Sequence, residues 1–457
     1  MSKEKQKINA VFKEYNEIIQ YIKDNSDTCD RIESNQTIML RNCIFESTIE
    51  FQLLLCNLKS NWKNLAGIDF TASVFKGAVY LNQAQPKEKK DENGKTINIE
   101  YFNADLNIAL DFQGVHFMKE LRFHSVNFLE NINFTNATFD EKVELNQLNF
   151  RKNFRLPETT FNSDVSFAYS TLDTKTTFFT SPEDRPKFKG NVSFWGTTLG
   201  DARFWDFIFE KDIDFTNTHF KSDVFFNRAK FSGKLILRSV ETMGRTIFDG
   251  NLYFDEAIID NLQLENILLE TTLSLNSAKI NTVKFKNVLF ARNPLALSAT
   301  NIKHIEDEYT ARILKHEAFK SSNQFLAIEF RAKEMTMHYR KLKWFKEPFE
   351  KLAFWLNYKS NTYGLNWGKG TCFTLIVWIL FFSLFIIARD GWGTIFIWTD
   401  PEYLKEAVNY FWVFNGILGL GTKTNWYEIL PFFLGKIFIA YGIYQTITAF
   451  RKHGQNR

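Results

Sequence analysis

The side chains that most often carry out chemistry are present in this chain, but they are not spaced for it. The seven His residues form neither an H-E-x-x-H motif nor another paired ligand spacing. The four Cys residues show no C-x-x-C spacing, which argues against a zinc site or a disulfide framework and fits a reducing compartment. Neither glycine-rich nucleotide motif is present, and no Ser or Cys lies in a nucleophile-elbow context. The sequence therefore predicts no enzyme activity and no catalytic, cofactor-binding or metal-binding residues.

Polar residues inside the apolar C-terminal part are the clearest candidates for a functional site. Lys436 and Gln445 interrupt the apolar segment 430–450. We expect the Lys436 ammonium to snorkel toward the outer face of a membrane, with a pore or a partner contact as the alternative. Gly419 and Gly421 lie one residue apart between this segment and an earlier apolar one. These residues matter only if the surrounding segments enter a membrane.

Two apolar segments are long enough to cross a bilayer. Residues 371–388 carry no charge, and residues 430–450 carry only Lys436. Basic residues precede the first segment and follow the second, so the positive-inside rule places both chain termini in the cytoplasm. We expect a two-pass protein of the inner (cytoplasmic) membrane, with membrane lipids as partners.

A repeat of bulky apolar residues precedes this membrane part. Neither the helix period nor the strand period persists through it. A smaller apolar residue, such as Val115 or Ala137, often lies two positions earlier and shares the inward side. Two interleaved series with a period of eleven residues are Phe112, Phe123, Phe134, Leu145, Leu156, Phe167, Phe178 and Phe117, Phe128, Phe139, Phe150, Phe161, Leu172. A short fixed period is typical of stacked repeats, so we expect a solenoid with these side chains inside.

This pattern resembles the Phe-rich branch of the pentapeptide-repeat family, whose motif reads A-x-F-x-x. The resemblance covers about residues 102–290, with an early start at Phe45, Phe70, Phe75 and Leu81. It implies a mainly β fold, a right-handed quadrilateral β-helix, over residues 40–295. The bulky apolar residues of the two series are called ladder residues below. Turn-forming Asn, Asp, Ser and Gly between them suit the corners of such a β-helix. The polar residues 83–99 are expected to form a loop inserted at one corner.

Helical segments are expected on both sides of the repeat. Residues 1–30 carry apolar residues at helical spacing, which predicts an N-terminal helix that caps the solenoid. Residues 300–345 favour a connector of two helices separated at 321–323. We expect His304, His316 and His338 to lie on these helices and to contact solvent or neighbouring carboxylates. Residues 346–369 alternate aromatic residues with lysines, which predicts an interfacial amphipathic helix on an anionic leaflet, before a two-span module at 370–457.

The C-terminal part also resembles the two-span membrane module of some bacterial pentapeptide-repeat proteins. The likeness lies in "NTYGLNWGKG" before the first span and "GIYQTITAFRKHG" after the second. Some members of that group carry a potassium-channel pore, in which a short helix precedes a row of ion-coordinating backbone carbonyls. Here residues 407–415 would be the pore helix of a re-entrant or interfacial segment at 407–422. The candidate filter residues, in the place of T-V-G-Y-G, are Ile417, Leu418, Gly419, Leu420 and Gly421. Ile417 replaces the filter Thr, which removes an ion ligand.

The sequence leaves two functions open. The first is a membrane-anchored scaffold whose solenoid surface binds an unidentified protein partner. The second is an oligomeric two-transmembrane ion channel with a cytoplasmic pentapeptide-repeat gating or assembly domain. A pore around an axis needs several subunits, so a homo-oligomer is expected. A nucleic-acid mimic would need a strongly acidic repeat, whereas Lys and Arg nearly balance Asp and Glu over residues 102–290, so no nucleic-acid partner is expected.

Overall fold

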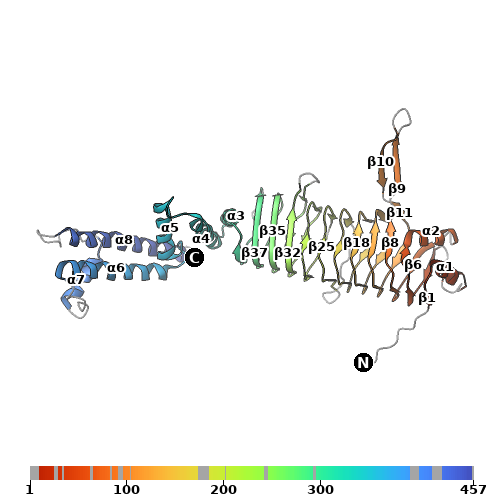
Figure 1. Ribbon diagram of the computed structural model, residues 1–457, viewed down its shortest axis with the longest axis horizontal. Coiled ribbons are helices and arrows are strands. Elements are labelled where there is room, and N and C mark those ends of the chain that lie inside the picture. Colours follow the sequence, from red (N-terminus) through yellow and green to blue (C-terminus); the bar gives the residue numbers. More distant parts are fainter. Residues whose placement is uncertain are drawn as a thin grey trace, which may run out of the picture. The chain divides into compact units, whose positions relative to one another are not determined.

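The computed structural model describes residues 10–24, 29–32, 35–61, 65–82, 85–90, 96–102, 104–172, 185–200, 202–240, 245–291, 295–391, 401–413 and 425–454. The chain divides into two units, Met1–Glu306 and Asp307–Arg457, and each is described by itself. The first unit is built mainly from parallel strands and the second from helices (Figure 1).

The described strands of the first unit form five sheets: a two-stranded antiparallel hairpin and four larger sheets in which the pairing is almost entirely parallel. One sheet contains β2 (Cys29–Ile32), β3 (Asn35–Met39), β6 (Leu65–Asp69), β12 (Ala109–Asp111), β16 (Ile132–Asn133) and β20 (Phe154–Arg155). A second contains β11 (Ala104–Leu106), β15 (Val126–Phe128), β19 (Asn149–Phe150), β23 (Thr171–Leu172), β26 (Thr198–Leu199), β30 (His219–Phe220) and β33 (Ile247–Phe248). A third contains β27 (Ala202–Arg203), β31 (Val224–Phe225), β34 (Leu252–Tyr253) and β36 (Leu273–Ser274).

The largest sheet contains two columns of short strands that merge into three long strands. The first column is β1 (Ala10–Phe12), β4 (Cys43–Phe45), β7 (Val74–Phe75), β13 (His116–Phe117), β17 (Thr138–Phe139), β21 (Thr160–Phe161), β24 (Lys187–Phe188) and β28 (Ile208–Phe209). The second column is β5 (Ile49–Glu50), β8 (Val79–Asn82), β14 (Leu121–His124), β18 (Val143–Asn146), β22 (Val165–Ser166), β25 (Val192–Ser193) and β29 (Ile213–Asp214). Both columns end on β32 (Lys230–Arg238), which is followed by β35 (Ile258–Leu269), β37 (Lys279–Phe290) and β38 (Asn301–Ile305).

The register of these sheets follows the sequence repeat. Phe117 pairs with Phe139, and Phe139 pairs with Phe161, so these neighbouring strands lie 22 residues apart in the chain. Along the chain, β12, β13, β14 and β15 occupy four successive columns of strands, and β16 then pairs with β12. These ladder residues therefore lie beside their counterparts two periods of eleven residues away, whereas Phe161 pairs with Phe188, which is 27 residues later.

The core of the first unit is made of the ladder side chains, as predicted. The rings of Phe117 and Phe139 stack with their centroids 4.8 Å apart and their planes 2° apart. The smaller residues Val115 and Ala137 are also fully buried. Burial of the large and small apolar groups of each repeat removes much hydrophobic surface from water, which stabilises the first unit.

The N-terminal segment contains a shorter helix than predicted and a strand before it. Val11 and Phe12 lie in β1, which pairs with β4, and helix α1 spans only Tyr15–Asp24. The sequence analysis did not anticipate helix α2 (Phe51–Asn61), whose Phe51 ring contacts those of Phe70 and Phe112. The apolar residues of the segment are thus divided between a strand and a helix, and they do not form one continuous helix.

The polar stretch 83–99 is not a plain loop. Strands β9 (Gln85–Lys90) and β10 (Thr96–Phe102) pair antiparallel as a hairpin, with an irregularity near Thr96. Figure 1 shows this hairpin extending away from the stacked strands of its unit. The residues of β9 are almost all polar, so hydrophobic patterning gave no signal for this strand.

The second unit contains six of the eight helices in the described residues. Helices α3 (Glu308–Lys320) and α4 (Gln324–Lys341) are separated at 321–323, as predicted, and α5 spans Pro348–Asn361. Asp307 caps α3 by accepting a hydrogen bond from the Thr310 amide at 2.8 Å. His316 and His338 lie on α3 and α4, whereas His304 lies in β38 rather than on a helix.

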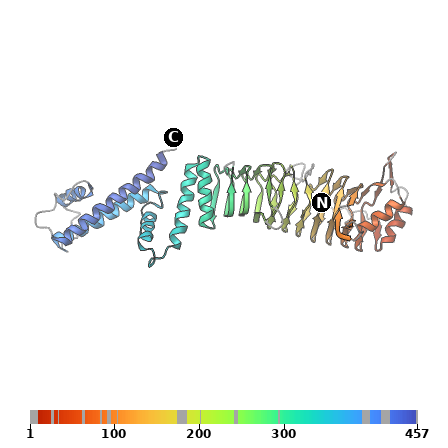
Figure 2. The ribbon, with the colours of Figure 1, turned by 90° about the horizontal axis from the view of Figure 1, so that it is seen from above.

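Two helices of this unit are long and apolar enough to cross a membrane. They are α6 (Trp367–Asp390), with a mean hydropathy of 2.6, and the Trp426–Phe450 part of α8 (Trp426–Gly454), with a mean hydropathy of 1.3. Figures 1 and 2 both show α6 and α8 side by side. Helix α7 (Pro401–Phe411) begins six residues before the expected pore helix and ends before Asn415. The candidate filter residues Ile417, Leu418, Gly419, Leu420 and Gly421 lie outside the described residues.

Candidate functional site in the helical unit

Small residues bring α6 and α8 into close antiparallel contact. A Cβ atom added to Gly442 would lie 2.4 Å from Thr374 Oγ1, and one added to Gly370 would lie 2.8 Å from Thr446 Oγ1. Each threonine hydroxyl donates to the carbonyl of the glycine four residues earlier on its own helix, at 2.8 and 2.9 Å. Small residues four apart on both helices let the backbones approach, which is the usual contact between membrane helices.

Lys436 is buried against the C-terminal end of α7. Its Nζ donates to the carbonyl oxygens of Tyr410 at 2.7 Å and Trp412 at 2.5 Å. The ammonium also lies 5.2 Å from the centre of the Tyr410 ring and 5.3 Å from that of Phe432. The residue is only 9% exposed, so the expectation of a snorkelling Lys436 is wrong.

The last turn of α7 is held by side chains from both long helices. Carbonyls in the last turn of a helix have no partner within the helix. Trp378 Nε1 of α6 donates to the Ala407 carbonyl at 2.9 Å, and Lys436 of α8 donates to the carbonyls of Tyr410 and of Trp412, which lies just beyond the helix. The Tyr410 hydroxyl donates to the carbonyl of Pro431 in α8 at 2.9 Å. A positive charge at the negative end of the α7 dipole adds to these bonds.

Gln445 joins α8 to the end of α5. The side-chain amide of Asn361 donates to the Gln445 backbone carbonyl at 3.1 Å and to Gln445 Oε1 at 2.5 Å. The side-chain Oδ1 of Asn361 in turn accepts from the Gly364 backbone amide at 2.8 Å. Both side chains are buried, so Gln445 is a structural link between two helices rather than a lone polar group facing lipid.

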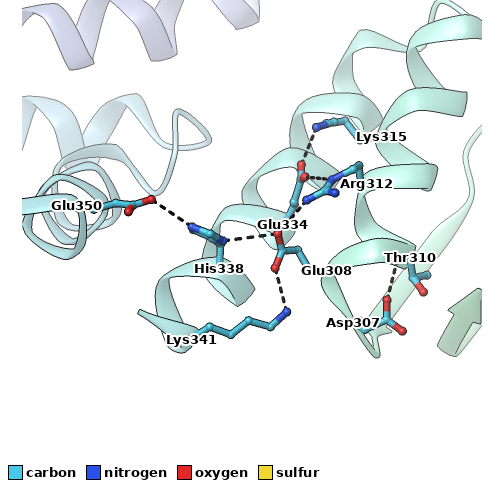
Figure 3. A network of polar contacts seen from close by, with 9 residues as sticks. All are labelled: Asp307, Glu308, Thr310, Arg312, Lys315, Glu334, His338, Lys341 and Glu350. Carbon is cyan, nitrogen blue, oxygen red and sulfur yellow. Dashed lines mark hydrogen bonds and ion pairs between the residues drawn. The ribbon is translucent and has the colours of Figure 1, made fainter. Parts of the chain in front are cut away.

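An ion-pair network connects α3, α4 and α5 (Figure 3). The buried carboxylate of Glu334 accepts from Arg312 Nε at 3.0 Å and Lys315 Nζ at 2.6 Å. His338 Nε2 lies 3.3 Å from Glu350 Oε1 of α5, which confirms the expected contact of this His with a carboxylate. Among described residues, no three His, Cys, Asp or Glu side chains form a group that could hold a metal ion.

Glu308 is the carboxylate of this network with the clearest change in acidity. The hydrogen bond from Lys341 Nζ, 2.9 Å long, lowers the pKa of Glu308 below its usual value, and the charges of Lys341, His338 and Arg312 act in the same direction. Partial burial opposes this shift. The network therefore keeps the Glu308 carboxylate charged and paired, which is suited to joining helices.

The chain matches no family model, no curated protein and no solved structure. Its function must therefore be argued from the contacts described above. Those contacts are hydrogen bonds and ion pairs that join helices to one another.

Several of these residues were not singled out from the sequence. Thr374 follows Gly370 by four residues, and Thr446 follows Gly442 by four, so the paired spacing was visible in both apolar segments. The partner of Lys436 was not visible, because it is the backbone of a separate helix whose position depends on tertiary packing. The same holds for Glu334, whose basic partners lie on the preceding helix.

Proposed function

We propose that this chain is a non-enzymatic, membrane-anchored protein whose first unit is an interaction scaffold at the inner membrane. Its partners are membrane lipids, a second copy of the chain and a protein that binds the outer surface of the first unit. The proposal combines a solenoid, a two-span anchor and a segment between the spans that does not conduct ions.

For the first unit, we infer a right-handed quadrilateral β-helix of the pentapeptide-repeat family. The chain visits four columns of strands in a fixed order and returns to the first after 22 residues, which supports a four-sided path. Residues between strands have positive φ angles, which turn the backbone sharply where corners are required: Asn136 (57°), Gln147 (55°), Glu158 (56°) and Tyr169 (57°). The inward ladder of large and small residues agrees with the A-x-F-x-x pattern.

For the second unit, we infer a two-pass anchor with both termini in the cytoplasm. The two apolar helices have the required length, and the basic residues lie before α6 and after α8. The rings of Phe345 and Phe349 are exposed beside the exposed Lys343 and Lys346, which supports a membrane-surface position for α5 and the turn before it. Lipid headgroups would satisfy the lysines while the rings enter the leaflet.

The contact of Lys436 with α7 is the observation that favours an anchor over a channel. In a potassium-channel pore, a short helix points its carbonyl end toward the conducted ion. Here the corresponding end of α7 is occupied by the chain's own ammonium group. A positive charge in this place opposes the approach of a second cation.

The alternative, an oligomeric channel with a cytoplasmic gating or assembly domain, is favoured by one feature. Helix α7 is too short to span a bilayer and contacts both long helices through Trp378 and Lys436, as a pore helix would. In that case Lys436 would be the group that holds the pore closed. The two proposals differ in a single measurable property, which is ion flux.

The experiment uses full-length protein in cells and in proteoliposomes. We expect it to remain in the membrane pellet after alkaline carbonate treatment and to enter solution only with detergent. Proteoliposomes loaded with K⁺ should show no flux above empty vesicles, with valinomycin added afterwards to confirm that they are intact. Release by carbonate would contradict the anchor, and protein-dependent K⁺ flux would favour the channel.

A further inference from the structure

One outward-facing row of residues on the first unit differs in composition from the rest of its surface. Each residue of the row comes immediately before the buried ladder residue of its strand. The six residues pair with one another across six neighbouring strands. Lysine and isoleucine alternate along it: Lys187, Ile208, Lys230, Ile258, Lys279 and Asn301. Ile208 and Ile258 are 50% and 48% exposed, respectively, although their neighbours in the same strands are buried core residues.

The lysines of this row lack the ion pairs that are common on the other faces. Elsewhere a basic side chain between strands often reaches a carboxylate about 22 residues away in the neighbouring repeat: Lys119–Glu141, Lys152–Glu130 and Arg228–Asp206, at 2.7 to 2.8 Å. Within the described residues, Lys187, Lys230 and Lys279 form no such pair. The row therefore presents three uncompensated positive charges separated by exposed aliphatic groups.

A groove runs beside the row. It has a volume of about 490 Å³. One side is formed by Lys230, Ile258 and Lys279, and the other by Ser232, Asp260, Asn281 and Lys303, which are the residues after the buried ladder positions. Three lysines against one aspartate give the groove a positive charge, and Asp260 is already bonded to the Asn281 amide at 3.0 Å.

We propose that this row and groove are a docking surface for an acidic amphipathic helix of a partner protein. The inference rests on the proposed scaffold function and identifies where its protein partner binds. Paired strands are about 4.8 Å apart, so successive lysines of the row are about 10 Å apart with an isoleucine midway. An α-helix repeats its face about every 10.5 Å, or seven residues, with an intervening turn near 5 Å. Acidic residues seven apart, with apolar residues on the turn between them, would match both groups.

The exposed isoleucines of the row indicate which class of partner binds it. A nucleic-acid backbone offers regularly spaced negative charges but no aliphatic surface to cover Ile208 and Ile258. A helix with one acidic and one apolar group on alternate turns covers both kinds of side chain. Burial of the isoleucines would provide affinity, and the lysines would favour this partner over neutral or basic helices.

The test uses full-length protein in detergent and fluorescence anisotropy. The probe is a labelled helical peptide of about 18 residues, with Glu at every seventh position and Leu on the intervening turns. The reference probe has the same composition with the Glu and Leu positions scrambled. We expect the patterned peptide to bind at least about tenfold more tightly than the scrambled one, with affinity falling as salt is added.

Variants locate the binding to the row. Lys230→Glu with Lys279→Glu should weaken binding by about tenfold or more, and Ile258→Ser should weaken it without changing its salt dependence. The control, Lys142→Glu with Lys152→Glu, makes the same change in net charge at exposed positions outside the groove. Equal binding of both peptides, equal effects of both double variants, or full competition by a single-stranded DNA oligonucleotide would overturn the proposal.

The test of the docking surface and the test of the membrane anchor can fail independently of each other. The Lys230→Glu and Lys279→Glu variant should still resist carbonate extraction, because α6 and α8 are unchanged. A carbonate-resistant, non-conducting protein that binds neither peptide would reject the docking surface and leave the anchor intact. A protein that conducts K⁺ would reject the anchor proposal whatever the peptides show.

Discussion

The side-chain amide of Asn361 donates to both carbonyl oxygens of Gln445, at 3.1 Å to the backbone and 2.5 Å to the side chain. This pair joins the C-terminal end of α5 to the last third of α8, which are 84 residues apart in the sequence. Because α5 carries exposed basic and aromatic residues, the link fixes its end relative to the second long apolar helix. The polar group that interrupts the second apolar segment thus has a structural role.

Replacing Asn361 by Ala should destabilise the second unit by about 1–3 kcal/mol, because the Gln445 side-chain and backbone carbonyl oxygens would lose the buried amide donor of Asn361. Thermal unfolding of the detergent-solubilised protein, followed by tryptophan fluorescence, measures the change. Asn357→Ala is the control, because this residue lies on the same helix and is only half-buried. Equal melting temperatures for the two variants would mean that the Asn361–Gln445 contact contributes nothing.

The burial of the ladder could be predicted from the sequence because it depends on local spacing. Each short strand contributes one large side chain, and the strand itself determines that residues two apart share a face. Phe117, Phe139 and Phe161 are therefore identified by counting, without knowledge of the rest of the chain. The sharp turns were also visible as polar residues between ladder positions, although Glu158 and Tyr169 are unusual at positive φ.

The features that sequence reasoning missed depend on distant partners. The sequence of β9 (Gln85–Lys90) is almost entirely polar and has no alternating apolar pattern, and α2 uses Phe51 to contact rings that belong to later repeats. Lys436 was misjudged because snorkelling assumes that the side chain has only lipid beside it. The position of α7 supplies carbonyl partners that no local pattern reveals.

Truncation of one ladder ring should have a large effect on the first unit. Phe134→Ala removes a ring that stacks on Phe112, with centroids 5.0 Å apart, and that contacts Phe139 and Phe154. We expect a loss of about 3–5 kcal/mol, as for other fully buried aromatic residues. Urea unfolding followed by far-UV circular dichroism measures it, with the half-buried Thr138→Ala as control. An unchanged urea midpoint would contradict burial of the Phe134 ring.

Two glycines of the repeat should respond differently to substitution. A Cβ added to Gly190 would lie 2.2 Å from the Ser163 carbonyl carbon, so Gly190→Ala must separate neighbouring chain segments and should cost about 1–3 kcal/mol. Gly114 has a φ of 65° and no atom closer than 3.9 Å to an added Cβ. Asn136 adopts the same backbone conformation one circuit later, so Gly114→Asn should change stability by less than about 0.5 kcal/mol. The same urea measurement compares them, and the reverse order would refute the close contact.

The stability of the second unit should depend on the charge of Glu308. Its folded pKa lies below the unfolded value, so the ionised carboxylate stabilises the fold above the unfolded pKa, and this contribution is lost as the pH falls through the folded pKa. Glu308→Gln should lower the melting temperature at neutral pH, by an amount equivalent to at most about 1 kcal/mol, and should have little effect in acid. Melting curves between neutral and acidic pH measure this dependence. Glu347→Gln, which removes an exposed carboxylate without a capping bond, is the control.

The last prediction concerns the contact on which the anchor proposal depends. Lys436→Met removes the buried donor to the Tyr410 and Trp412 carbonyls, so we expect a loss of about 1–3 kcal/mol and faster hydrogen exchange in α7. Ile437→Met, at the adjacent exposed position of α8, should leave both properties unchanged. If the ammonium only caps α7, vesicles containing Lys436→Met will remain impermeable to K⁺. If K⁺ flux appears in this variant and not in the wild type, the lysine closes a pore, and the channel becomes the better description of the second unit.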